Sequence, residues 1–219
     1  MAQLFRKRSF GGATYHLPAE VTQAQSAIVL QRWREPGIKL ALWRRSWDQA
    51  DVRQLDALPI EALPNVHFTA RLDAVRASIE AALPGARACD ATLPGVIAYD
   101  IESLAACFAH ATGARAIEVR LQALQDDACR LFHLDRMRAR MVTTYIGPGT
   151  EWVPERYARD AIRSQDDYAG PIYAMPRFAV GLFAGSLLPN GGLVHRSPRL
   201  SNTGRFRLFL SLNEARKAK

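Results

Sequence analysis

The hydrophobic pattern of this chain changes from a helical period to a strand period at Gly113. Downstream of Gly113, Ile117, Val119 and Leu121 alternate with charged residues, as in a strand with one buried face. Upstream, apolar residues recur at steps of three and four and so share one helical face: Phe68, Leu72, Val75, Ile79 and Leu83. Helices followed by a run of short strands predict an α+β fold.

Turn and capping residues divide this pattern into elements. Helices are expected over residues 48–58, 68–83 and 101–112, the last with Asp100 as its N-cap and Gly113 as its C-terminal αL residue. Strands are expected over residues 37–43, 117–121, 131–133, 139–146, 178–186, 193–196 and 205–212. Turns rich in Gly and Asn separate the later strands, at residues 147–149, 190–192 and 202–204, and favour antiparallel neighbours.

This arrangement predicts a double-stranded β-helix (a jelly-roll or cupin-like core) flanked by N-terminal helices. With 219 residues and 48% hydrophobic content, the chain suits one domain with one sizeable core, residues 1–219. Residues 1–113 are expected to form a largely helical N-terminal elaboration. Residues 114–213 are expected to contain most of the jelly-roll metal-binding core.

His133, Asp135 and His195 are the candidate metal ligands and the candidate catalytic residues. Along a strand, residues i and i+2 point to the same face about 6.5–7 Å apart, so His133 and Asp135 can reach one ion. His195 ends a short apolar strand elsewhere in the chain. Two histidines and one carboxylate from different strands form the facial triad that holds non-heme Fe(II) with open positions, and Zn or Mn are the alternatives.

Arg205 and Arg207 are the candidate cosubstrate-binding residues. Both follow the turn after His195, and alternation places them on one face of a strand. If that face points into the barrel, a buried arginine needs a carboxylate partner, which the distal carboxylate of 2-oxoglutarate would provide. Arg205 is the first choice and Arg207 the second, while a solvated pair of arginines remains the alternative.

Two further pairs of residues have candidate roles. Thr144 and Tyr145, on the strand after the first ligand pair, are candidates for a hydrogen bond to the cosubstrate, with a purely structural role as the alternative. Glu151 and Trp152 follow the Gly147–Gly149 turn and are candidates for lining a substrate pocket. A tryptophan that packs under its own loop is the alternative for Trp152.

The remaining histidines and the cysteines have no comparable pattern. The cysteines are three in number and widely spaced, which fits neither a disulfide framework nor a CxxC zinc site, although Cys129 is close enough to His133 to be an accessory ligand. No carboxylate or histidine stands at ligand spacing from the other histidines, namely His16, His67 and His110.

Composition narrows the class of protein. The net charge is +8, but basic and aromatic residues are not interleaved as a nucleic-acid platform requires, so nucleic acid is not the expected partner. No apolar stretch is long enough for a membrane span, and no apolar region follows the basic start of the chain, so a cytoplasmic location is expected.

Three segments carry a resemblance to a known family. They are Cys129–Asp135, Thr143–Trp152 and Val194–Pro198, and together they resemble a bacterial family catalogued as domain of unknown function 1826. The resemblance covers residues from about 35 to 213, and the same order of His-x-Asp, His and Arg implies a relation to jelly-roll 2-oxoglutarate/Fe(II)-dependent oxygenases. Family members look as if they are often encoded beside zinc-handling proteins, which implies a link to metal homeostasis.

The sequence therefore predicts a non-heme Fe(II)- and 2-oxoglutarate-dependent oxygenase that hydroxylates a small molecule or peptide. Two alternatives stay open. One is a cupin-like enzyme that holds Zn, Mn or Fe without a keto-acid cosubstrate, and the other is a non-catalytic metal- or partner-binding protein linked to metal homeostasis. The substrate and the oligomeric state are left open by the sequence.

Overall fold

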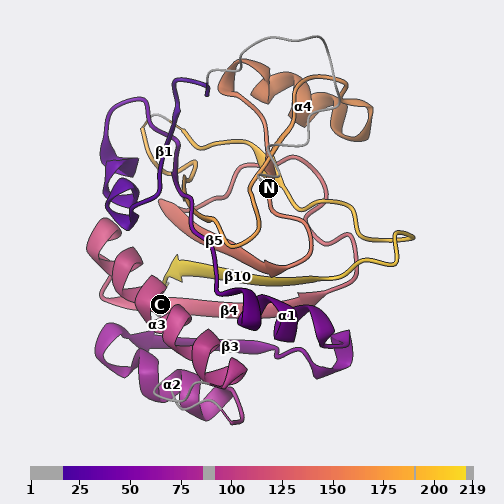
Figure 1. Cartoon of the computed structure of the whole chain (residues 1–219). Coiled ribbons are helices and arrows are strands. Elements are labelled where there is room, and N and C mark those ends of the chain that lie inside the picture. The colour runs from indigo at the N-terminus through magenta and orange to yellow at the C-terminus, as the bar shows by residue number, and fades with distance from the viewer. Residues whose placement is uncertain (1–16, 86–91, 190, 216–219) are drawn as a thin grey trace.

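The computed structural model describes residues 17–85, 92–189 and 191–215 of the chain. It is a mixed α/β structure built around a large, mostly antiparallel sheet (Figure 1). The strands are β1 (Val21–Ala24), β2 (Leu40–Trp43), β3 (Val66–Arg71), β4 (Ala116–Leu124), β5 (Ala139–Ile146), β6 (Glu151–Trp152), β7 (Tyr173–Ala174), β8 (Val180–Ala184), β9 (His195–Arg196) and β10 (Arg207–Glu214). The α-helices are α1 (Gln49–Ala57), α2 (Val75–Ala82), α3 (Leu93–Thr112) and α4 (Ala158–Ser164), and 3₁₀ helices span residues 27–34, 60–62, 72–74, 155–157 and 165–167.

The strands form two sheets. The large sheet has seven strands in the order β1-β2-β8-β5-β10-β4-β3, and only the β1–β2 pair is parallel. The small sheet has three strands in the order β7-β6-β9, and both of its pairs are antiparallel. An isolated bridge between His133 and His195 adds the segment before β5 to the edge of the small sheet.

Helices α1, α2 and α3 cover one face of the large sheet (Figure 1). The alternation along β10 explains this, because Leu208, Leu210 and Leu212 point to the helical side and share its core with Phe108 of α3. All of these side chains are at most 1% exposed. Burial of each leucine side chain stabilises the folded chain by on the order of 2 kcal/mol. These leucines therefore hold one face of β10 against the helices, and the opposite face is left for the site.

The opposite face of the large sheet carries the polar residues and meets the small sheet. Trp152 of β6 and Leu193 pack there against Val142 of β5 and Phe183 of β8. This second core covers only one end of the sheet. A cavity remains over the part formed by β4, β5 and β10.

Several expected elements are confirmed. Strand β5 has the predicted bounds, and β4, β8 and β10 lie within three residues of theirs. The helix expected over residues 48–58 is α1 (Gln49–Ala57), and the Asp48 side chain caps it by accepting from the Ala50 N–H. Gly113 ends α3 at φ 80°, the left-handed conformation that glycine adopts without a steric penalty.

Three expectations differ from the structure. The helical period predicts a helix from residue 68, but residues 66–71 form β3, because this segment pairs with the edge of β4 and thereby buries Val66 and Ala70 in the core under the helices. Asp100 lies inside α3 rather than at its N-cap, which is Thr92. The segment at 131–133 forms a single bridge rather than a strand.

The N-terminal part of the chain contributes to the large sheet as well as to the helical layer. Strands β1, β2 and β3 all come from residues 1–113, which the sequence pattern predicts to be a largely helical elaboration with one strand at 37–43. No helix within the described residues is long and apolar enough to cross a membrane.

Candidate metal centre

His133, Asp135 and His195 lie together at the edge of the small sheet. One possible ligand atom from each residue lies within 4.8 Å of the others. The backbone sets this arrangement, because the His133 N–H donates to the His195 carbonyl at 3.0 Å and the His195 N–H donates to the His133 carbonyl at 3.1 Å. The two imidazole rings are then 4.6 Å apart between centroids. The structure therefore brings together the three residues that the sequence singles out.

Hydrogen bonds to the backbone set the orientation of both rings. Nδ1 of His133 lies 2.8 Å from the Leu131 carbonyl oxygen, and Nδ1 of His195 lies 2.9 Å from that of Leu193. A carbonyl oxygen only accepts, so each Nδ1 carries the proton and donates it. In the neutral rings, Nε2 then presents a lone pair, which is the arrangement of metal-binding histidines in proteins.

Asp135 completes the cluster with one free oxygen. Its Oδ1 accepts a hydrogen bond from Nη1 of Arg140 at 2.8 Å. Its Oδ2 is buried and accepts no hydrogen bond from any described residue, although Nε2 of His195 is 3.2 Å away. A carboxylate oxygen and an imidazole lone pair repel each other at this distance unless a cation or a proton lies between them. The donor set therefore fits a divalent metal ion.

The pKa shifts of His133 and Asp135 favour the metal-binding forms of these two side chains. Burial lowers the pKa of His133 below its ordinary value of 6.5, and the neighbouring His195 lowers it further. Burial alone would raise the pKa of Asp135, but a hydrogen bond from His195, formed when a proton instead of a metal lies between the two side chains, and the charge of Arg140 hold that pKa below the ordinary value of 3.8. A neutral imidazole and an ionised carboxylate are the forms that bind metal, so neither residue needs to lose a proton near neutral pH.

Arg207 is a buried cation without a carboxylate partner. It is 1% exposed and lies on the same face of the large sheet as the cluster. Its guanidinium donates only to hydroxyls: to Thr144 at 2.9 Å, to Thr150 at 2.7 Å and to Ser197 at 3.3 Å. Among the described residues no carboxylate pairs with it, and burial lowers its pKa to about 9. A buried guanidinium of this kind is a strong candidate to bind an anion.

The structure separates the two candidate arginines. Arg205 is exposed and precedes the start of β10, so it does not share the environment of Arg207. The Phe209 ring packs on Arg207, with its centroid 4.1 Å from the guanidinium carbon, and Phe209 lines the cavity while Arg207 does not. Of the two, only Arg207 is in a position to meet a ligand beside the cluster.

Thr144 and Tyr145 point to opposite faces of β5. Thr144 accepts two hydrogen bonds from Arg207 and so belongs to the site. Tyr145 is fully buried on the helical side, where its hydroxyl donates to Asp100 at 2.7 Å and Asp100 pairs with Arg45. Burial raises the pKa of Tyr145 well above the ordinary value. Tyr145 is therefore part of the core beneath the site.

The turn before β6 places the Thr150 hydroxyl within hydrogen-bond distance of Arg207. Gly147 has φ 83°, and a Cβ atom at this position would lie 2.2 Å from the Phe206 carbonyl oxygen, so only glycine fits. Glu151 points to one side of β6 and accepts from Arg196 at 2.7 Å. Trp152 is fully buried and stacks on Tyr173 with ring centroids 4.6 Å apart, so it packs beneath its loop and does not line the cavity.

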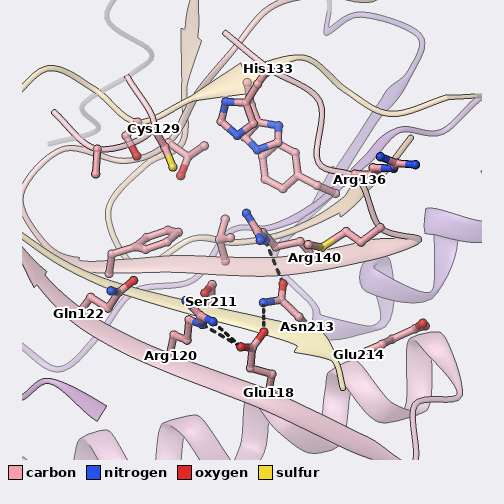
Figure 2. A pocket seen from close by; sticks show the side chains of 18 of the residues that line it. Glu118, Arg120, Gln122, Cys129, His133, Arg136, Arg140, Ser211, Asn213 and Glu214 are labelled. Atoms are coloured by element: carbon pink, nitrogen blue, oxygen red, sulfur yellow. Dashed lines mark hydrogen bonds and ion pairs between the residues drawn. The ribbon is translucent and has the colours of Figure 1, made fainter. Parts of the chain in front are cut away.

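A cavity of about 900 Å³ adjoins the cluster (Figure 2). His133 stands on one wall, and Arg120, Asn213 and Glu118 form the floor opposite, on β4 and β10. Cys129 also lines this cavity but contributes no atom to the cluster.

The other histidines lie away from the cluster or outside the described residues. His67 is on β3 and contacts Glu118 at 3.0 Å, and His110 lies near the end of α3. His16, like Cys89, lies outside the residues that the structure describes.

Comparison with known proteins identifies the family. The family described as "Protein of unknown function (DUF1826)" matches residues 24–213, and the chain therefore belongs to it. Among solved structures, the chain is similar to a prolyl-4-hydroxylase from Pseudomonas putida, with 14% identity over 88% of this chain and 94% of the other, at a TM-score of 0.43. It is also similar to a bsmA homolog from Methylobium petroleophilum, with 13% identity over 85% of this chain and 91% of the other, at a TM-score of 0.41. No curated protein matches the chain.

Proposed function

We propose that this protein is a non-heme Fe(II)- and 2-oxoglutarate-dependent oxygenase. The observation that carries the proposal is a buried guanidinium with only hydroxyl partners, on the same sheet face as a His-Asp-His cluster. A metal site alone would fit many enzymes. A second, separate position for an anion is what a dicarboxylate keto acid requires, because one end binds the metal and the other needs a cation.

Each residue has a defined part in this proposal. His133, His195 and Asp135 would hold the metal through the two Nε2 atoms and Oδ2, the atoms that their other contacts leave free. Bound there, Fe(II) supplies open coordination positions and one-electron chemistry. Arg207 would hold the distal carboxylate of the keto acid, and the hydroxyls of Thr144, Thr150 and Ser197 would keep the guanidinium in place.

The presence of two sheets supports a further part of the proposal. We propose that the large and the small sheet are the two walls of a jelly roll within a single domain, with the metal at the edge of the small wall and Arg207 on the large one. The cavity beside the cluster is where the substrate would bind, and its volume of about 900 Å³ suits a small molecule or a peptide side chain.

A second candidate function is a cupin-like enzyme that holds Zn, Mn or Fe without a keto acid. It is favoured by the position of Phe209, whose ring covers Arg207 and leaves it 1% exposed. In the oxygenase, Phe209 has to rotate before a carboxylate reaches the guanidinium. In the second candidate, Arg207 only ties β10 to Thr144 and Thr150.

Anaerobic absorption spectroscopy separates the two candidates. When 2-oxoglutarate is added to the Fe(II)-loaded protein without oxygen, we expect a weak visible metal-to-ligand charge-transfer band. Zn(II)-loaded protein should show no band, because Zn(II) has a filled d shell. A protein that binds Fe(II) but gives no band at saturating 2-oxoglutarate would rule out the oxygenase and leave the metal enzyme without a keto acid.

A further inference from the structure

We propose that Arg140 is the positioning residue of the metal centre and restricts Asp135 to a single ligating oxygen. The proposal rests on the metal centre described above. It adds to that centre two residues of the cavity floor, Arg140 and Asn213. It concerns a residue that acts on the metal through Asp135 and is not itself one of the candidate ligands.

Arg140 belongs to a row of polar residues that crosses three strands. Asn213 of β10 stands directly opposite Glu118 of β4 on one side and Arg140 of β5 on the other. Nε of Arg140 donates to the Asn213 side-chain oxygen at 2.9 Å, and the Asn213 amide donates to Glu118 at 3.0 Å (Figure 2). The row ends at Arg120, whose guanidinium donates to Glu118 at 2.6 Å. Strand register therefore determines where the Arg140 guanidinium lies.

The far end of this row stays charged. Burial alone would raise the pKa of Glu118, but hydrogen bonds from Arg120, Asn213 and His67 hold it at about 2. Glu118 therefore accepts from Asn213 throughout the physiological range. The Asn213 amide is thereby oriented with its oxygen toward Arg140. The Arg140 guanidinium therefore links the row to the metal centre. Its Nε donates to Asn213, and its Nη1 donates to Asp135.

The contact with Asp135 involves one of its two oxygens. Nη1 of Arg140 lies 2.8 Å from Oδ1, and Oδ2 is left without a hydrogen bond from the described residues. A divalent cation shared by both oxygens would approach the guanidinium, and like charges at that distance repel each other. Arg140 thus favours coordination through Oδ2 alone, which is the oxygen nearest His195. A carboxylate that uses one oxygen leaves an additional coordination position open.

The test compares metal binding in three variants and one control. Arg140→Gln removes the cation, Arg140→Lys keeps the charge without the forked geometry, and Asn213→Ala removes the support of the Arg140 guanidinium. Arg138→Gln is the matched control, since Arg138 lines the same cavity, is more exposed and pairs with Glu214 instead of Asp135. Mn(II) affinity by calorimetry and the Co(II) absorption spectrum, which reports coordination number, are measured without any substrate.

We expect Arg140→Gln to lower Mn(II) affinity by about 10- to 100-fold and to change the Co(II) spectrum. Arg140→Lys and Asn213→Ala should shift both in the same direction by less, and Arg138→Gln should match the native protein. Native affinity and spectrum in Arg140→Gln and Asn213→Ala would overturn the proposal, as would a loss of thermal stability with unchanged metal binding. If the native protein binds neither metal, the metal centre itself is refuted, which is a different outcome from failure of the Arg140 role alone.

Discussion

His195→Ala is expected to abolish specific metal binding. The substitution removes one of the three proposed protein ligands and the ring nitrogen that lies 3.2 Å from Asp135 Oδ2. Replacing a residue that merely supports a ligand lowers metal affinity by about 10- to 100-fold, and loss of the ligand itself should exceed that. Titration of the metal-free protein with Mn(II), followed by calorimetry, measures the change.

A histidine outside the cluster provides the control for this prediction. His110→Ala removes an exposed imidazole near the end of α3, and it leaves all three candidate ligands and the row of residues behind Asp135 in place. Native Mn(II) affinity is therefore expected in His110→Ala. Full retention of the metal by His195→Ala would show that the ion binds elsewhere, and the facial-triad interpretation would be wrong.

Arg207→Met is expected to prevent binding of 2-oxoglutarate while metal binding persists. Methionine fills a similar apolar volume, so the buried position stays packed after the charge is removed. Loss of a buried charge partner for a carboxylate weakens binding by about 2 kcal/mol or more, which is roughly 30-fold or more in affinity. The intensity of the anaerobic charge-transfer band as a function of 2-oxoglutarate concentration gives that affinity.

The matched control is the neighbouring arginine. Arg205 is exposed and lies outside β10, so Arg205→Ala should bind 2-oxoglutarate as the native protein does. In the opposite pattern, Arg205→Ala binds 2-oxoglutarate weakly and Arg207→Met binds it normally. That result would show that the carboxylate binds at Arg205 and not at Arg207 with its hydroxyl partners Thr144, Thr150 and Ser197. Impairment of Mn(II) binding in Arg207→Met would instead mean that Arg207 supports the fold of the metal centre.

The fold was predictable where hydrophobic period and turn chemistry agree. Strand β5 and the end of α3 at Gly113 are examples, because alternation or a positive φ leaves one physical solution there. Strand β3 was not predictable from its own residues. Its apolar positions fit a helical face equally well, and only the unpaired edge of β4, from a distant part of the chain, decides between the two.

The candidate metal ligands were predictable as a cluster because their residue types and their spacing point to metal chemistry. His133-x-Asp135 needs only a local extended backbone, and His195 needs only to reach the same edge. The choice between Arg205 and Arg207 was not predictable. Alternation places both on one face, whereas the structure starts β10 at Arg207 and leaves Arg205 in solvent.

The supporting residues of the site could not be found by any local pattern. Arg140 acquires its role from strand register, which places Asn213 opposite both Arg140 and Glu118. Thr150 and Ser197 reach Arg207 from a glycine turn and from the segment after β9. Single hydroxyls and a lone arginine have no distinctive spacing, so tertiary structure alone reveals them.

A crystal structure grown without oxygen in the presence of Mn(II) and 2-oxoglutarate would locate both ligands in one measurement. We predict an anomalous peak in coordination contact with Nε2 of His133, Nε2 of His195 and Oδ2 of Asp135, and the distal carboxylate of 2-oxoglutarate on Arg207 with Phe209 rotated away. Metal bound at any other residues, or a keto acid that leaves Arg207 covered by Phe209, would contradict the assignment of this protein as a 2-oxoglutarate-dependent oxygenase.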